Sequence, residues 1–143
     1  MTHLLSAMGL GIVVYAVTED FLLTTSAIIG AGGLDLDHVV EYKFHYGVEA
    51  PLAELLRPGS IAQWPQLIFV LHGYEWVVGL VLAAWYWQVP EIMGLIIGIL
   101  VHLLMDEAGN RLPDNRHRIH PLFYFFTFRL IKGFSTKKIS RFI

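Results

Sequence analysis

Four apolar stretches separated by short polar breaks constrain the fold of this chain more than any other feature. They cover about residues 4–17, 21–34, 67–87 and 92–105. The chain is 55% hydrophobic and 15% charged, whereas soluble domains carry about a quarter charged residues. A soluble domain of 143 residues cannot bury so much apolar surface. The composition therefore predicts a membrane protein.

The polar breaks indicate how the stretches are arranged. An acidic residue at mid-bilayer costs at least about 2.5 kcal/mol unless it is paired, so residues 18–20, which include Glu19 and Asp20, are expected to form a turn. Pro90 marks a second turn. We therefore predict an all-α integral membrane protein with one membrane domain, 1–143, and four membrane helices arranged as two hairpins. Their expected ranges are about 3–17, 20–34, 66–88 and 91–108.

The positive charges agree with this topology. The two hairpin turns carry no Lys or Arg, and every cation falls on the side that holds both termini. Cytoplasmic loops carry the excess of Lys and Arg. The sequence therefore predicts a multi-pass protein of the cytoplasmic (inner) membrane with both termini in the cytoplasm. The short helices are compatible with an oligomer.

The C-terminal residues, about 119–143, mix aromatic side chains with cations. This pattern is typical of an amphipathic segment that lies in the membrane interface and contacts anionic headgroups. A packed cap over the helices explains the same pattern equally well. Membrane lipids are the expected partners, and we expect no nucleic acid.

The predicted topology brings His and acidic residues to one membrane face. Such groups persist at membrane depth mainly when they are paired or bind a ligand. The chain has no cysteine, and nitrogen and oxygen donors suit zinc best, with manganese or iron as alternatives. The candidate metal ligands are His3, Asp35, Asp37, His72, His102 and Asp106, with His38 and Glu75 beside them.

Each of these residues also has a simpler explanation. His102 and Asp106, four residues apart, more often form an ordinary hydrogen bond within a helix than a ligand pair. Asp35 and Asp37 are also typical of a loop start or a helix cap. His72 and Glu75, three residues apart, are expected on one helical face. The simpler explanations are that His72 lies at the membrane interface and that Glu75 pairs with Lys43 or Arg57. Only the joint placement of all these residues favours a divalent metal site.

Four segments carry a resemblance to a known family. THLL at 2–5, GLDLDH at 33–38, LHGYE at 71–75 and HLLMD at 102–106 resemble, in this order, motifs of the membrane-bound metal-dependent hydrolases. That family is similar to a membrane-embedded form of the helical fold of zinc phospholipase C and P1 nuclease. The resemblance covers about residues 2–110.

By this resemblance, the metal-site positions correspond to His3, Asp35, Asp37, His38, His72, His102 and Asp106. The third motif departs from the family pattern, in which a second histidine follows the first. Here Glu75 follows His72. Either Glu75 acts as a ligand or the site holds fewer metal ions.

The leading hypothesis is a metal-dependent hydrolase that acts on a phosphoester or a lipid-like small molecule at the cytoplasmic face. Glu75 is the expected general base, and His38 either binds the metal or orients a neighbouring Asp. Arg116 and Arg118 are candidates for binding an anionic substrate. The first alternative is a non-catalytic membrane protein with a structural metal or polar cluster. A metal or ion transporter is weaker, because the ionisable residues do not form a path across the bilayer.

Overall fold

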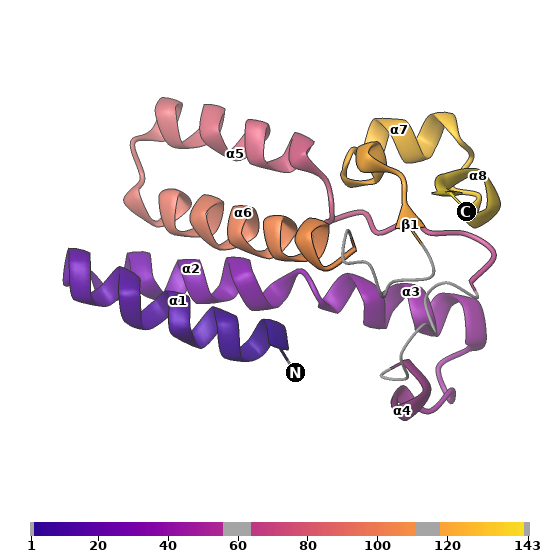
Figure 1. Ribbon diagram of the computed structural model, residues 1–143. Coiled ribbons are helices and arrows are strands. Elements are labelled where there is room, and N and C mark those ends of the chain that lie inside the picture. Colours follow the sequence, from indigo (N-terminus) through magenta and orange to yellow (C-terminus); the bar gives the residue numbers. More distant parts are fainter. Residues whose placement is uncertain (1, 56–63, 111–117, 142–143) are drawn as a thin grey trace. The chain divides into compact units, whose positions relative to one another are not determined.

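The computed structural model describes residues 2–55, 64–110 and 118–141 (Figure 1). A single membrane domain was predicted, whereas contacts along the chain define two compact units. Unit 1 contains Met1–Leu34 and Tyr74–Asp106. Unit 2 contains Asp35–Gly73 and Glu107–Ile143. Each unit is therefore built from two separate segments of the chain.

Unit 1 consists of two helical pairs, each joined by a tight turn. The helices are α1 (Thr2–Thr18), α2 (Phe21–Gly33), α5 (Tyr74–Trp87) and the first part of α6 (Pro90–Asn110). Helix α2 begins after Asp20, whose Oδ1 accepts the N–H of Leu23 at 3.0 Å. Pro90 occupies the first position of α6, where its missing N–H removes no helical hydrogen bond. Both predicted turns are confirmed.

Glycines allow α2 and α6 to pack closely. A Cβ placed on Gly98 of α6 would contact the backbone oxygen of Ala27 and lie 2.6 Å from the nitrogen of Ala31. A Cβ on Gly30 of α2 would lie 2.6 Å from the carbonyl oxygen of Leu95. Any larger residue at these positions would push the two backbones apart. The packing of unit 1 therefore depends on small residues between α2 and α6.

The prediction of four membrane helices is wrong. In the described part of the chain, α6 is the one helix long and apolar enough to cross a membrane, with 21 residues. Helix α1 has 17 residues, α2 has 13 and α5 has 14. At about 1.5 Å per residue, helices of 13 or 14 residues fall well short of a hydrocarbon core about 30 Å thick. The predicted third helix began at 66, but α5 begins only at Tyr74.

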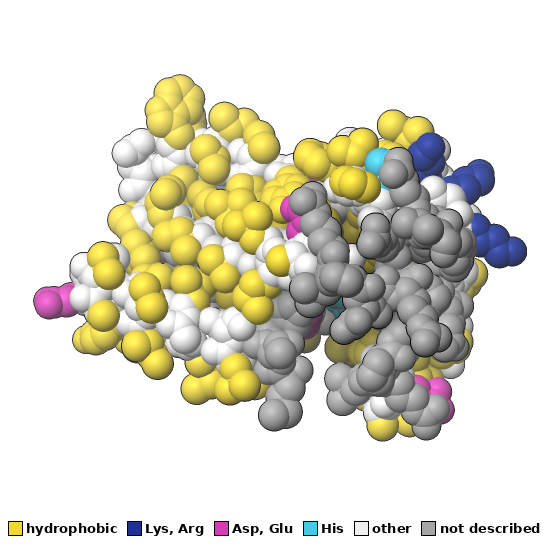
Figure 2. All heavy atoms as spheres, viewed as in Figure 1, with side chains coloured by type: hydrophobic (Ala, Val, Ile, Leu, Met, Phe, Trp, Pro, Cys, Tyr) yellow, Lys and Arg dark blue, Asp and Glu magenta, His cyan; other side chains and the backbone are white. Residues whose placement is uncertain are grey.

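Helix α6 is a candidate membrane span by its length and composition. The buried core helix of a soluble protein can meet the same two criteria. Only 28% of its apolar window is buried. Large apolar side chains are also exposed elsewhere on unit 1, including Val17 at 79%, Trp85 at 75% and Tyr86 at 76%. Figure 2 shows hydrophobic side chains spread over this unit. The surface of unit 1 is therefore apolar.

Unit 2 combines short helices with irregular segments. Its helical elements are α3 (Leu36–Tyr46), α4 (Leu52–Leu55), η2 (Pro121–Tyr124), α7 (Phe126–Ile131) and α8 (Thr136–Ile139). Strand β1 (Arg118–Ile119) pairs antiparallel with β2 (Ser140–Arg141). Gln66 forms an isolated bridge with Ser135. The β1–β2 pairing lies within the C-terminal segment of unit 2, whereas the Gln66–Ser135 bridge joins its two chain segments.

Two predictions about unit 2 need correction. No helix was predicted between residues 34 and 66, but α3 occupies the first part of this region and ends at Tyr46, before Gly47, whose φ is 88°. The region 119–143 was expected to be one interfacial segment, but several short elements divide it. Positive φ angles at Gly133 and Phe134 separate α7 from α8. Side chains from both chain segments form the core: Trp64, Leu67, Phe69, Phe123 and Ile139.

Candidate functional site

His102 lies buried in α6 with a defined ring orientation. Its Nδ1 is 2.7 Å from the carbonyl oxygen of Ala31. Ala31 is in the last turn of α2, where carbonyls have no partner within the helix. A carbonyl oxygen only accepts hydrogen bonds, so Nδ1 of His102 must carry the proton. The close packing of α2 and α6 therefore selects the protonated nitrogen of this ring.

The other nitrogen of His102 faces Asp106. Nε2 lies 3.4 Å from Oδ2 of Asp106, one turn further along α6. This confirms the predicted i,i+4 pair. Because Nδ1 holds a proton, a neutral His102 presents a lone pair at Nε2 towards a carboxylate. Two electron-rich groups in this position need either a second proton on the ring or a shared cation.

His72 has a similar arrangement within unit 2. It is 1% exposed, and its Nδ1 lies 3.3 Å from Oδ2 of Asp37 on α3. The same oxygen accepts the N–H of Leu71 at 2.6 Å. The expectation that His72 and Glu75 share one helical face is wrong, because His72 precedes α5. The Asp37 carboxylate, rather than a helix, orients His72.

Asp37 is suited to accept these hydrogen bonds because it is ionised. Burial by itself raises its pKa. The hydrogen bonds from His72 and from the backbone of Leu71, together with the charges of His72 and His38, outweigh burial and lower the pKa below its ordinary value. Asp37 thus binds His72 as a carboxylate.

The segment that carries His72 depends on a second carboxylate, Glu41, one turn after Asp37 on α3. Its Oε1 accepts the N–H of Ile68 at 2.7 Å, and its Oε2 accepts the N–H of Phe69 at 2.6 Å. Glu41 is 5% exposed. A buried segment outside helices and strands must find other partners for its backbone groups. The acidic residues of α3 supply acceptors for three of its N–H groups.

Arg129 of α7 supplies the donors for the carbonyls of the same segment. Its Nη1 donates to the carbonyls of His72 at 2.8 Å and Phe123 at 2.5 Å, and its Nη2 donates to Phe69 at 2.8 Å. The side chain is completely buried, and its guanidinium lies 5.0 Å from the ring centroid of Phe123. The carboxylates of α3 therefore bond the N–H groups of the segment around His72, and Arg129 bonds its carbonyl groups.

Among the described residues, Asp35, His72 and His102 form a group that could hold a metal ion. Asp35 stands at the start of α3 but makes no capping hydrogen bond with its side chain. All three residues were predicted as ligands. Two imidazole nitrogens and one carboxylate oxygen suit zinc, iron or manganese.

The other predicted site residues have different positions. The ring of His38 stacks on Phe69, with centroids 4.4 Å apart, and meets the ring of His72 edge-on at 4.6 Å. Glu75 lies in the first turn of α5 in unit 1. The side chains of His3 and Arg118 and the whole of Arg116 lie outside the described residues.

Glu41 and Arg129 were not predicted as site residues from the sequence. Glu41 follows Asp37 by one helical turn, a spacing that would have signalled a shared acidic face if α3 had been recognised. Arg129 lies among Phe125, Phe126 and Phe128 in the sequence. This setting is typical of an interfacial cation, and it concealed a buried one.

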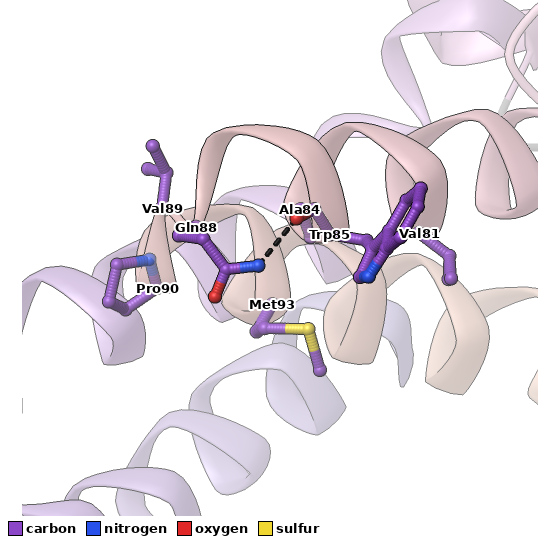
Figure 3. A pocket seen from close by; sticks show the side chains of 7 residues that line it. All are labelled: Val81, Ala84, Trp85, Gln88, Val89, Pro90 and Met93. Atoms are coloured by element: carbon purple, nitrogen blue, oxygen red, sulfur yellow. Dashed lines mark hydrogen bonds between the residues drawn. The ribbon is translucent and has the colours of Figure 1, made fainter.

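Among the hollows on the described residues, two have linings that bear on the site. The larger, about 430 Å³, is at the α5–α6 turn in unit 1 and has no ionisable residue in its lining. Figure 3 shows Trp85, Gln88 and Met93 among its lining residues. The smaller, about 160 Å³, is in unit 2 and is lined by Asp37, Val40, Glu41, Phe44, Ile68 and Val70. Of the two, only the smaller adjoins a residue that contacts a candidate ligand.

Comparisons with protein families, curated proteins and solved structures found no match to this chain.

Proposed function

We propose that this chain is a metal-dependent hydrolase whose ion is bound by Asp35, His72 and His102. The observation that carries the proposal is the shared orientation of the two histidines. Each directs Nδ1 at an oxygen acceptor, Ala31 for His102 and Asp37 for His72. Histidine ligands commonly donate one ring N–H to a carbonyl or carboxylate and bind the metal through the other nitrogen. Both rings have the oxygen acceptor that this arrangement requires at Nδ1.

This proposal changes the roles of two predicted ligands. Asp37 contacts the ring of His72, and Asp106 contacts the ring of His102. In the proposal Asp37 orients His72 and is not itself a ligand, and Asp106 lies beside the coordinating nitrogen of His102. Three protein ligands leave a coordination position for water, as catalytic zinc sites do. When bound, such an ion lowers the pKa of its water and polarises the scissile group.

Glu75 remains the proposed general base and His38 a proposed positioning residue. The substrate proposal is a phosphoester or lipid-like molecule. The small hollow beside Asp37 supports the lipid-like class, because Val40, Phe44, Ile68 and Val70 offer an apolar surface for an alkyl group. Arg116 and Arg118 stay proposed partners for an anionic group of the substrate.

We place the enzyme at the cytoplasmic membrane, with α6 as its candidate span. No Lys or Arg occurs at residues 70–90, whereas eight occur after the end of α6 (Arg111, Arg116, Arg118, Arg129, Lys132, Lys137, Lys138 and Arg141). This bias favours a cytoplasmic location for the C-terminal end of α6. His102 and Asp106 are near that end. The prediction that both termini are cytoplasmic relied on four spans and is not carried forward.

The deciding experiment is the metal content of purified protein, measured by elemental mass spectrometry. Near-stoichiometric zinc, iron or manganese is expected in the wild type and should be lost in Asp35→Asn, His72→Ala and His102→Ala. Asp37→Asn should lower metal affinity about 10–100-fold. His120→Ala is the matched control, because His120 caps η2 and is not one of the candidate ligands. A wild type that binds none of these ions after reconstitution contradicts the proposal.

Hydrolysis is tested separately with chromogenic phosphodiesters and with phospholipids. Glu75→Gln should retain the metal and lose turnover. If turnover is unchanged in this variant, Glu75 is not the base. If metal-loaded protein hydrolyses none of these substrates, the hydrolase assignment fails while the metal site stands.

A structural polar cluster is the second candidate. His102 with Asp106, and His72 with Asp37, each make a complete charged or hydrogen-bonded pair without an ion if the rings are protonated. This reading predicts no bound metal and a loss of stability in each His→Ala variant. Nitrogen-15 NMR of the imidazole rings distinguishes the two readings, because protonated rings carry hydrogen on both nitrogens.

A further inference from the structure

The surface of α7 and α8 in unit 2 combines exposed apolar side chains with lysines. Ile131 is 81% exposed, Leu130 56%, Leu122 47% and Phe125 39%. Apolar residues of this size, exposed together on a small domain, commonly mark a contact surface. They occur on η2, on α7 and at the junction between these two elements. We call these four residues, together with Lys132, Lys137 and Lys138, the α7–α8 patch.

The lysines give the patch a single sign of charge. Lys137 and Lys138 are exposed on α8, and the Nζ of Lys132 lies 5.6 Å from the centroid of the Phe128 ring. The sequence has no Asp or Glu after Asp114, so this chain segment contains no anion that could neutralise them. Figure 2 shows Lys and Arg side chains gathered next to hydrophobic ones over α7 and α8.

Hydrogen bonds and buried side chains attach the elements of the patch to the core of unit 2. Arg129 holds α7 to the carbonyls of Phe69 and Phe123, and Ile139 and Thr136 anchor α8 in the core. The ring of Phe128 stacks on His120, with centroids 4.6 Å apart. The exposed side chains are therefore presented by a structured surface and do not require a segment to fold on binding.

We propose that the α7–α8 patch docks on a lipid bilayer that contains anionic headgroups. Exposed aliphatic side chains enter the boundary between headgroups and acyl chains, and adjacent lysines attract anionic lipid. The positive charge of the patch and the negative charge of such a membrane are complementary. This docking uses unit 2 alone, and it requires neither a metal ion nor the predicted four-helix topology.

The absence of cysteine makes the test specific, because a single introduced thiol can be labelled without background. Ile131→Cys carries an environment-sensitive bimane in full-length protein reconstituted into phosphatidylcholine vesicles with or without phosphatidylglycerol. Glu49→Cys, at an exposed position of unit 2, is the control label site. We expect a blue shift and quenching by brominated lipid at position 131 only, stronger with phosphatidylglycerol and reduced by added salt.

Two triple variants of the lysines separate the effect of their positive charge from that of the apolar side chains on membrane binding. Replacing Lys132, Lys137 and Lys138 together by Gln should abolish the effect of phosphatidylglycerol, whereas replacing them by Arg should preserve it. A label at position 131 that stays water-exposed in both vesicle types overturns the proposal. A blue shift that depends on protein concentration in detergent and persists without lipid also overturns it, because a second protein chain then covers the patch.

Discussion

The two units satisfy their backbone groups in different ways. In unit 1, α1, α2, α5 and α6 bond most of their own N–H and C=O groups, so the side chains between and around them can be apolar. Unit 2 contains the irregular segment 64–73, whose backbone requires partners from elsewhere. Asp37, Glu41 and Arg129 provide those partners from buried positions. Buried charge in unit 2 thus performs the role that helix formation performs in unit 1.

Loss of Arg129 should disturb this arrangement most. Arg129→Met removes the guanidinium donors from the carbonyls of Phe69, His72 and Phe123, and we expect a loss of about 3–5 kcal/mol. Hydrogen exchange followed by mass spectrometry should show loss of protection in unit 2, with α1 and α2 unchanged. Lys138→Met, at an exposed position, serves as the control. Equal loss of protection in both units would show that unit 2 does not depend on buried charge more than unit 1 does.

The opposite perturbation is directed at unit 1. Gly98→Val forces α6 away from α2, and overpacking of this kind typically costs about 1–3 kcal/mol. It should also move Ala31 from His102 and lower metal affinity. Gly79→Val on α5 is the control, because a Cβ at Gly79 meets nothing within 4 Å. The readouts are exchange protection of α2 and bound metal; a Gly98→Val protein that matches the control contradicts the packing argument.

A smaller effect is expected from Glu41→Gln, which keeps the size of the side chain. One amide oxygen cannot replace two carboxylate oxygens, so either Ile68 or Phe69 loses its acceptor. The expected cost is about 1–3 kcal/mol, measured by chemical unfolding. Glu49→Gln at an exposed position should change nothing. An unchanged Glu41→Gln midpoint would show that these two hydrogen bonds do not stabilise unit 2.

The smallest expected effect is at the α1–α2 turn. Asp20→Ala removes the acceptor for the N–H of Leu23 and should cost about 1 kcal/mol. Asp20→Ser keeps a capping oxygen and should recover most of the loss. Thermal unfolding of the two variants gives the comparison, and identical melting temperatures would argue against a capping role.

The sequence predicted the bounds of a helix well where a long apolar run forms most of that helix. The predicted ranges 3–17, 20–34 and 91–108 agree with α1, α2 and α6 to within two residues. The prediction failed at 66–73, because an apolar segment can be buried without being helical when side chains bond its backbone. Helix α3 was missed because its charged residues, Asp37 and Glu41, face the core of unit 2.

In the candidate site, too, the sequence predicted some features and not others. Asp35, His72 and His102 were predicted as ligands from residue type and order along the chain. The orienting contacts of Asp37 and of the Ala31 carbonyl depend on tertiary packing. Residue spacing contains no information about a carbonyl on another helix, so the sequence could not reveal which nitrogen of His102 carries the proton.

The discontinuous composition of the units has a consequence for biosynthesis. Every segment of unit 1 has been translated once Asp106 is added, whereas unit 2 still lacks residues 107–143. Until Arg129 is synthesised, the carbonyls of Phe69 and His72 lack the hydrogen bonds that its guanidinium donates. Unit 2 can therefore reach its final structure only after its second segment, which begins at Glu107, has been translated. A ribosome that stalls after α6 would present a helical unit with all of its segments joined to a unit that lacks its second segment.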